Sequence, residues 1–151
     1  MKLSDHFTLA EYATSETAAR RGIDNTPKAA YILANLKRMA AVMEQVRDIL
    51  GRNSIIVTSG YRCPELNAAI GSGPTSAHIK GLATDFICPG YGVPYDVCNT
   101  LVPEVERLGI DQLIYEFSWV HIGLRDEPRH QILTLKPGGG YVAGIVLRGS
   151  I

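Results

Sequence analysis

Two histidines and one aspartate are the residues of this sequence whose types and spacing could bind a metal. His78 and Asp85 lie seven residues apart, and His121 follows farther along the chain. Two imidazoles and one carboxylate are a typical ligand set for a catalytic Zn²⁺, because they leave a fourth position open for water. The pattern therefore predicts a zinc ion held by His78, Asp85 and His121.

Each of these residues, taken alone, also has an ordinary structural explanation. Asp85 lies within an apolar run, residues 82–87, where a carboxylate is costly unless a cation or a strong hydrogen-bond partner meets it. An Arg or backbone N–H groups would satisfy it as well as a metal. A single His in a strand, such as His121, is more often a satisfied core or edge residue than a ligand. The combination of the three residues favours a metal site.

A zinc hydrolase also needs a general base for the attacking water, and Glu116 is the candidate. If residues 117–118 form a two-residue hairpin turn, Glu116 pairs with Trp119 and Ile114 pairs with His121. Cross-strand partners share a face of the sheet, as do alternate residues along a strand. Glu116 is then expected on the same side as His121. The alternative is a solvated hairpin residue.

Arg62 is a second candidate for the chemistry, because it directly follows a predicted strand. An Arg at a strand end can polarise a carbonyl group or hold a substrate carboxylate through a bidentate pair. It could equally be a surface residue or a structural partner for Asp85.

The elements that must position these residues follow from caps, periodicity and breakers. Thr8 and Glu11 form a predicted capping box that starts a helix over residues 8–21. Thr26-Pro27 starts the next helix, whose apolar stripe runs to Leu50. Gly81 is expected to provide a tight bend between His78 and Asp85. Further helices are predicted at residues 64–70 and 94–108, the latter broken at Pro103, and strands at residues 54–58, 82–88, 112–117, 119–124, 131–135 and 141–147.

The order of these elements predicts the fold class. Helices come first and strands dominate later, without regular βαβ alternation. That order favours an α+β domain with helices on one face of a mainly antiparallel sheet. A length of 151 residues with 46% hydrophobic content fits a single domain over residues 1–151.

Composition excludes several other classes of function. Formal net charge is zero, with 15 basic and 15 acidic residues and no basic cluster, so we expect no nucleic-acid partner. No apolar run approaches the length of a membrane span. The N-terminus lacks a signal-peptide pattern, so we expect synthesis in the cytoplasm or exit by another route. The three cysteines, an odd number without a C-x-x-C pair, are expected to be free thiols.

Several short motifs, spread from Leu3 to Leu124, carry a family resemblance. They are Ser76-x-His78-x-x-Gly81-x-Ala83-x-Asp85, Trp119-x-His121, Ser59-Gly60-Tyr61-Arg62, Pro64-Glu65-Leu66-Asn67 and the opening Leu3-Ser4-Asp5-His6-Phe7-Thr8-Leu9-Ala10-Glu11-Tyr12. Together they resemble the M15 peptidases, which are the zinc D-Ala-D-Ala carboxypeptidases and the related L-Ala-D-Glu endopeptidases of phage lysins. The His/Asp spacing with Ser and Gly between is specific, whereas the Trp-x-His element alone is weak.

The resemblance implies a fold, a metal and a substrate. The fold is the one shared with the hedgehog signalling domain, and the metal is Zn²⁺ on the three residues named above. Arg62, Ser76 and Trp119 are expected to face the substrate, a stem peptide of peptidoglycan. In one respect the sequence departs from the family pattern. Many members place the catalytic carboxylate three residues before the last His ligand, where Ser118 stands here, and the nearest acid is Glu116.

Two functions are compatible with these features. The first is a monomeric zinc peptidase that cleaves peptidoglycan stem peptides, as a carboxypeptidase or an endopeptidase, by metal-activated water. Without a signal peptide it would reach the cell wall as a phage endolysin released through a holin or delivered with a virion. The second is a non-catalytic zinc-bearing binding or virion structural module of the same fold, since a fold does not fix a function.

Overall fold

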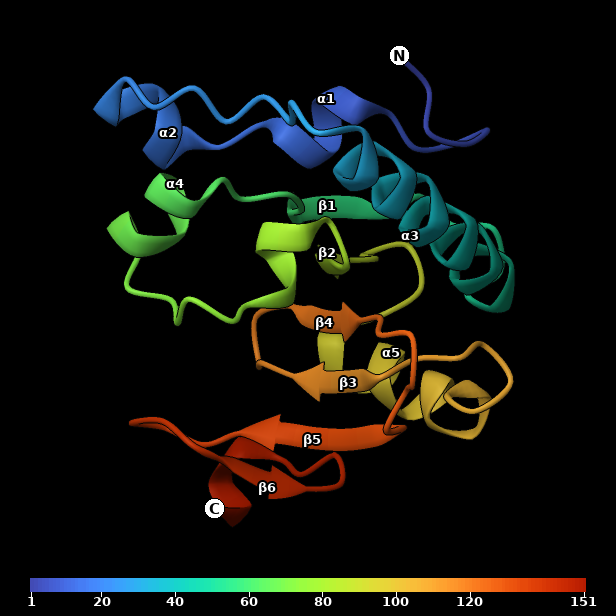
Figure 1. Ribbon diagram of the computed structural model, residues 1–151. Helices are drawn as coiled ribbons and strands as arrows, with labels where there is room; N and C mark the ends of the chain where they lie inside the picture. The colour runs from blue at the N-terminus through green and yellow to red at the C-terminus, as the bar shows by residue number, and fades with distance from the viewer.

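A six-stranded sheet forms the centre of the computed structural model, which describes residues 1–151 (Figure 1). The strands lie in the order β1-β2-β4-β3-β5-β6. Neighbouring strands are antiparallel except β3 and β5, which are parallel. The predicted α+β class with a mainly antiparallel sheet is confirmed. The strands are β1 (Ile56–Ser59), β2 (Ala83–Ile87), β3 (Gln112–Tyr115), β4 (Val120–Gly123), β5 (Gln131–Leu135) and β6 (Tyr141–Ala143).

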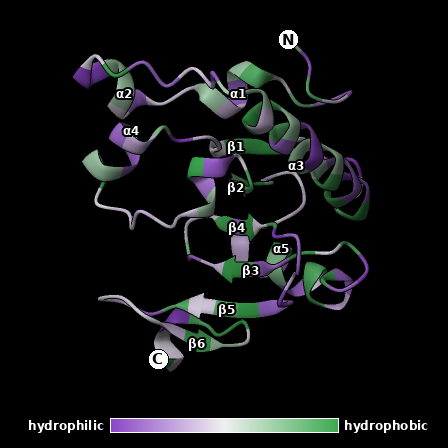
Figure 2. Ribbon diagram, viewed as in Figure 1, coloured by the Kyte–Doolittle hydropathy of each residue, from purple (hydrophilic) through white to green (hydrophobic).

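Two helices, α3 and α5, bury their apolar sides in the same core as one face of this sheet. Figure 2 shows β3 and β4 mainly in hydrophobic colours, whereas α3 alternates between the two colours, as expected for a helix with one buried side. No helix combines the length and the apolar character needed to cross a membrane. The helices are α1 (Leu9–Ala13), α2 (Glu16–Arg21), α3 (Ala30–Ile49), α4 (Pro64–Ala69) and α5 (Pro94–Leu101), with 3-10 turns η1 (Ala77–Lys80), η2 (Val102–Glu104) and η3 (Arg148–Ser150).

The two faces of the sheet have different roles because side chains alternate along each strand. Phe86 and Ile122, both fully buried, point into the core with α3 and α5. Asp85 and His121 are direct partners across β2 and β4, one residue away from those core residues. They therefore project from the opposite face, where no helix of the core covers them.

The predicted helix over residues 8–21 is wrong as a single element. The capping box at its start is present, but the chain forms two helices, α1 and α2. The Oγ1 atom of Thr14 donates to the carbonyl of Ala10, and the Oγ atom of Ser15 accepts from the backbone N–H of Ala18. These short hydroxyl side chains give the backbone other partners and start a new helix at that point.

Other boundaries differ by a few residues. The helix expected from Pro27 begins at Ala30, because the backbone N–H of Thr26 is held by Asp24 in a turn. The helix over residues 94–108 gives way to η2 after Leu101, at the predicted Pro103 break. The strand over residues 141–147 stops at Ala143, because Gly144 has a φ of 85°.

Candidate metal centre

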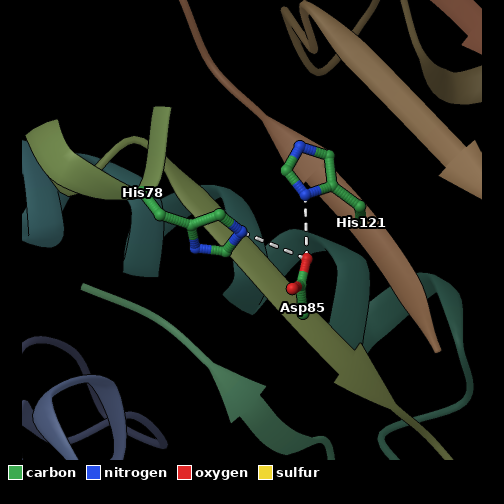
Figure 3. A group of neighbouring side chains, drawn as sticks. All are labelled: His78, Asp85 and His121. Carbon is green, nitrogen blue, oxygen red and sulfur yellow. Dashed lines mark hydrogen bonds and ion pairs between the residues drawn. The ribbon is translucent and has the colours of Figure 1, made fainter. Parts of the chain in front are cut away.

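The side chains of His78, Asp85 and His121 converge on the open face of the sheet (Figure 3). Atoms of the three that could bind a metal all lie within 4.8 Å of one another. The Oδ1 atom of Asp85 is 2.8 Å from Nδ1 of His121 and 3.3 Å from Nε2 of His78. The structure therefore brings together the three residues singled out from the sequence.

The 3-10 turn η1 positions His78 at this centre. The Oγ atom of Ser76 caps η1 by accepting from the backbone N–H of His78 at 3.3 Å. Gly81 ends η1 with a φ of 73°, a left-handed conformation that favours glycine, and the chain then turns into β2. An added Cβ at Gly81 would also meet Cγ of Leu36 at 3.1 Å. The tight bend expected at Gly81 is present.

A backbone carbonyl fixes the tautomer of His78. Its Nδ1 lies 2.7 Å from the carbonyl oxygen of Gly60, so Nδ1 must carry the proton and donate it. Burial, the largest effect, lowers the pKa of His78, so the ring is neutral and Nε2 presents a lone pair. This buried Nε2 has no hydrogen-bond partner. Two electron-rich atoms, Nε2 and the Asp85 oxygen, thus face each other, an arrangement that a cation between them would satisfy.

Asp85 is ionised in this setting. Burial opposes its charge, but the hydrogen bond with His121 and the positive charge of that ring hold the pKa of this carboxyl below its usual range. Burial also opposes the charge of His121 and so lowers the pKa of this ring. The hydrogen bond and charge of Asp85 outweigh burial, and the pKa of His121 is raised. The Nη2 atom of Arg62 lies 3.6 Å from the second oxygen, Oδ2 of Asp85. Arg62 is therefore a partner of Asp85, one of the alternatives that the sequence left open.

The hairpin between β3 and β4 has the predicted register. Ile114 pairs with His121, and the backbone N–H of Glu116 donates to the carbonyl of Trp119 at 3.1 Å. The Oε2 atom of Glu116 lies 3.9 Å from Nδ1 of His121, so this carboxylate faces the same centre. Burial, and then the negative charge of Asp85, raise the pKa of Glu116. The structure thus places an acid beside the three candidate ligands.

A strained turn aims Glu116. The backbone N–H of Ser118 donates to the carbonyl of Glu116 at 2.7 Å, and Phe117 between them has a φ of 61°. This pattern is a γ-turn of the rare, strained kind. The ring of Phe117 packs against Tyr115 with centroids 4.8 Å apart, and the guanidinium of Arg148 lies 5.0 Å from its centroid. These contacts hold the turn in place and with it the position of the carboxylate.

The centre opens into a cleft of about 450 Å³. The three residues expected to face a substrate, Arg62, Ser76 and Trp119, all line it. Tyr141 on β6 also lines it and was not anticipated. Its pairing with Leu135 on β5 carries it to this wall, and the parallel pairing of β5 with β3 has no local signal in the sequence.

Asp111 and Arg129 form a second polar contact of the cleft that sequence reasoning missed. The Nε and Nη2 atoms of Arg129 donate to the two carboxylate oxygens of Asp111, at 3.0 and 2.7 Å, and the Arg129 backbone N–H adds a third bond at 2.8 Å. The side chain of Asp111 is 7% exposed, that of Arg129 45%. This bidentate pair ties the loop before β5 to the start of β3.

Replacing Asp111 with Asn is expected to lower the unfolding free energy at neutral pH and to make it fall less on acidification than in the wild type. Hydrogen bonding to Arg129 lowers the pKa of Asp111 below its unfolded value of about 3.9. The pair therefore stabilises the fold fully above that value, and its contribution is lost as the pH falls through the lower, folded pKa. At pH 7 we expect a loss of about 1–2 kcal/mol in unfolding free energy. Urea unfolding of the wild type and the variant from about pH 7 down to about pH 3 would measure how the difference between their unfolding free energies narrows.

The exposed Asp48 provides the matched control, since its substitution by Asn removes the same charge from a surface pair with Arg52. That variant should unfold close to the wild type at both pH values. A deficit of Asp111→Asn that stays constant with pH would contradict the assigned pKa.

Comparison with known proteins was consistent with the geometry. A protein-family model described as peptidase M15 matches residues 5–123. The matched region includes the three candidate ligands as well as Arg62 and Glu116. A search of curated proteins found no match. Because the family match covers well over half of the chain, the protein belongs to the peptidase M15 family.

Proposed function

We propose that this peptidase is zinc-dependent and that it hydrolyses peptidoglycan stem peptides, as a carboxypeptidase or an endopeptidase. Membership of the M15 family supports a peptidase. The observation that carries the zinc assignment is the buried Nε2 of His78, which has no hydrogen-bond partner and faces the carboxylate of Asp85. A divalent cation shared with His121 would satisfy all three side chains.

Zn²⁺ bound there would supply Lewis acidity, making water a nucleophile near neutral pH and polarising the scissile carbonyl. The chain's own residues handle protons and charge. The Oε2 atom of Glu116, 3.9 Å from His121, is placed to take the proton of the attacking water and return it to the leaving amine. The guanidinium of Arg62 adds positive charge beside the oxygen that becomes negative. The carbonyl of Gly60 keeps His78 in the ligating tautomer.

The lining of the cleft supports a polar peptide as the substrate. Of its 17 residues only 4 are hydrophobic, so it does not suit a large apolar ligand. Trp119 and Tyr141 offer partly exposed aromatic surfaces, while Ser76 and other small polar residues offer hydrogen bonds. All of these groups come from one chain, so the proposal requires no second subunit and is compatible with a monomer.

Metal content and hydrolysis of defined stem peptides test the proposal together. We expect one zinc per chain, cleavage that stops on addition of a chelator and returns on addition of Zn²⁺, and products that identify the bond by mass spectrometry. Zinc binding without cleavage of any stem peptide would favour the non-catalytic module. Activity that persists after complete removal of the metal would overturn the zinc assignment.

Replacing Glu116 with Gln is expected to lower kcat by about 10²–10⁴-fold, because Gln cannot accept the proton of the attacking water. Zinc content should stay at the wild-type level, since Glu116 is not one of the three candidate ligands. The assay is steady-state hydrolysis of a purified stem peptide alongside metal analysis. Glu106→Gln, which removes the same charge from an exposed position, is the control. Wild-type turnover in Glu116→Gln would remove Glu116 from the mechanism.

A further inference from the structure

Arg129 belongs to a part of the chain that the family match does not reach. The match ends at residue 123, and Arg129 lies in the following loop, just before β5. Its side chain nevertheless lines the cleft that contains the metal centre. Asp111, which anchors it, directly precedes β3, whereas Glu116 directly follows β3. Arg129 and the Glu116 hairpin therefore mark opposite ends of the cleft along one strand.

Arg129 has one guanidinium nitrogen without any partner, whereas Arg62 has none. The Nε and Nη2 atoms of Arg129 are used by Asp111, but Nη1 makes no hydrogen bond and the side chain is 45% exposed. In Arg62 every nitrogen faces an acceptor. Its Nε donates to Ser59, its Nη1 donates to Asn67, and its Nη2 lies near Asp85. Of the two arginines that line this cleft, Arg129 is therefore the one with an unpartnered nitrogen available for a ligand.

The guanidinium is also held rigidly. Besides the side-chain bonds, the backbone N–H of Gln131 donates to the carbonyl of Asp111 at 2.8 Å. His130, between Arg129 and Gln131, has a φ of 55°, a left-handed conformation that a residue with a Cβ rarely adopts. Such strain persists only where surrounding contacts enforce it, and it is common at binding sites. A donor fixed in this way loses little entropy on binding a ligand.

The cleft does not end at Arg129. A second hollow, of about 830 Å³, adjoins the cleft and shares Thr75, Ala77, Asp111 and Arg129 with it. A bound peptide could therefore continue past the guanidinium. Asp111 lies three positions before Ile114, the partner of His121, which is about 10 Å along a strand. Arg129 would then meet a residue within about three positions of the scissile bond.

We propose that Arg129 is a specificity-determining residue that binds a carboxylate of the peptide substrate, on an acidic residue near the scissile bond. Arg binds carboxylates well because its planar N–H groups match the geometry of the two oxygens. Asp111 is the positioning residue that sets the plane of the guanidinium. The assignment of a peptide substrate rests on the proposed function.

Matched stem peptides test the assignment, one with a free carboxylate on its internal glutamyl residue and one with that group amidated. We expect the wild type to prefer the acid in kcat/KM. Arg129→Gln should lower kcat/KM about tenfold on the acid and leave the amide nearly unchanged. Arg129→Lys should keep only part of the preference, because lysine retains the positive charge but lacks the planar pair of N–H donors. A third peptide, amidated only at its C-terminus, should be cleaved with the same kcat/KM as the acid, and a loss that depends on Arg129 there would assign the arginine to the terminal carboxylate and overturn the proposal.

Binding is measured in parallel, so that this assignment and the proposed function can fail separately. Trp119, the single tryptophan, lines the cleft and can report peptide binding by fluorescence even if no bond is cleaved. Arg107→Gln, which removes a charge paired with Glu104 outside the cleft, is the control. Acid preference in binding that Arg129→Gln abolishes supports the assignment with or without hydrolysis. Equal losses on acid and amide, or an unchanged preference, would overturn it.

Discussion

Replacing Asp85 with Asn is expected to remove metal binding and peptidase activity together. Asp85 is the central residue of the three candidate ligands, because its Oδ1 atom lies near both His78 and His121. An amide has nearly the same shape but no negative charge, and its NH₂ group cannot bind a cation. A zinc site of this kind owes about 3 kcal/mol to each ligand, so affinity should fall at least about a hundredfold. Competition with a chromophoric chelator would measure the affinity, and stem-peptide hydrolysis the activity.

A matched surface variant separates loss of a ligand from loss of a charge. Asp48→Asn removes one carboxylate from the exposed pair with Arg52 and should keep both zinc and activity. Circular dichroism would establish that Asp85→Asn still folds, since its neighbours Arg62 and His121 retain other partners. A folded Asp85→Asn protein that binds zinc as tightly as the wild type would show that Asp85 is not a ligand.

The metal centre was the part of the molecule most open to prediction from sequence. His78 and Asp85 are separated by a short segment in which Gly81 signals a reversal, so their approach is a local matter. Glu116 and His121 lie on the two arms of one short hairpin, and the period-two alternation of strands then fixes which side each faces. Only the pairing of β2 with β4, which brings Asp85 to His121, required long-range information.

The support around the centre could not be predicted in the same way. Arg129 meets Asp111 because β5 lies parallel to β3, and nothing in either strand specifies that partner. Tyr141 reaches the cleft only through the same pairing. The carbonyl that orients His78 belongs to the backbone, and any residue type supplies one, so the sequence has no mark for it. The residue that supplies this carbonyl is Gly60, and glycine is needed at this position because any side chain would collide with Tyr12.

Replacing Gly60 with Ala is expected to destabilise the fold and weaken the metal site at once. An added Cβ would lie 2.5 Å from Cδ1, 2.7 Å from Cα and 2.8 Å from the carbonyl oxygen of Tyr12. Tyr12 cannot move aside, because it is fully buried and its hydroxyl is hydrogen-bonded to Thr84. The backbone at Gly60 must shift instead. Overpacking of this kind costs about 1–3 kcal/mol of unfolding free energy, which urea unfolding of the zinc-free protein would measure.

The same shift displaces the carbonyl that holds His78. Loss of such an orienting bond lowers metal affinity by about 10–100-fold, so zinc competition well below the unfolding transition should show a weaker site in the folded Gly60→Ala protein. Gly149→Ala is the control, because an added Cβ there meets nothing within 4 Å. A Gly60→Ala protein that loses stability but keeps full zinc affinity would separate the packing at Tyr12 from the orientation of His78. The carbonyl of Gly60 would then have no part in orienting His78 as a ligand.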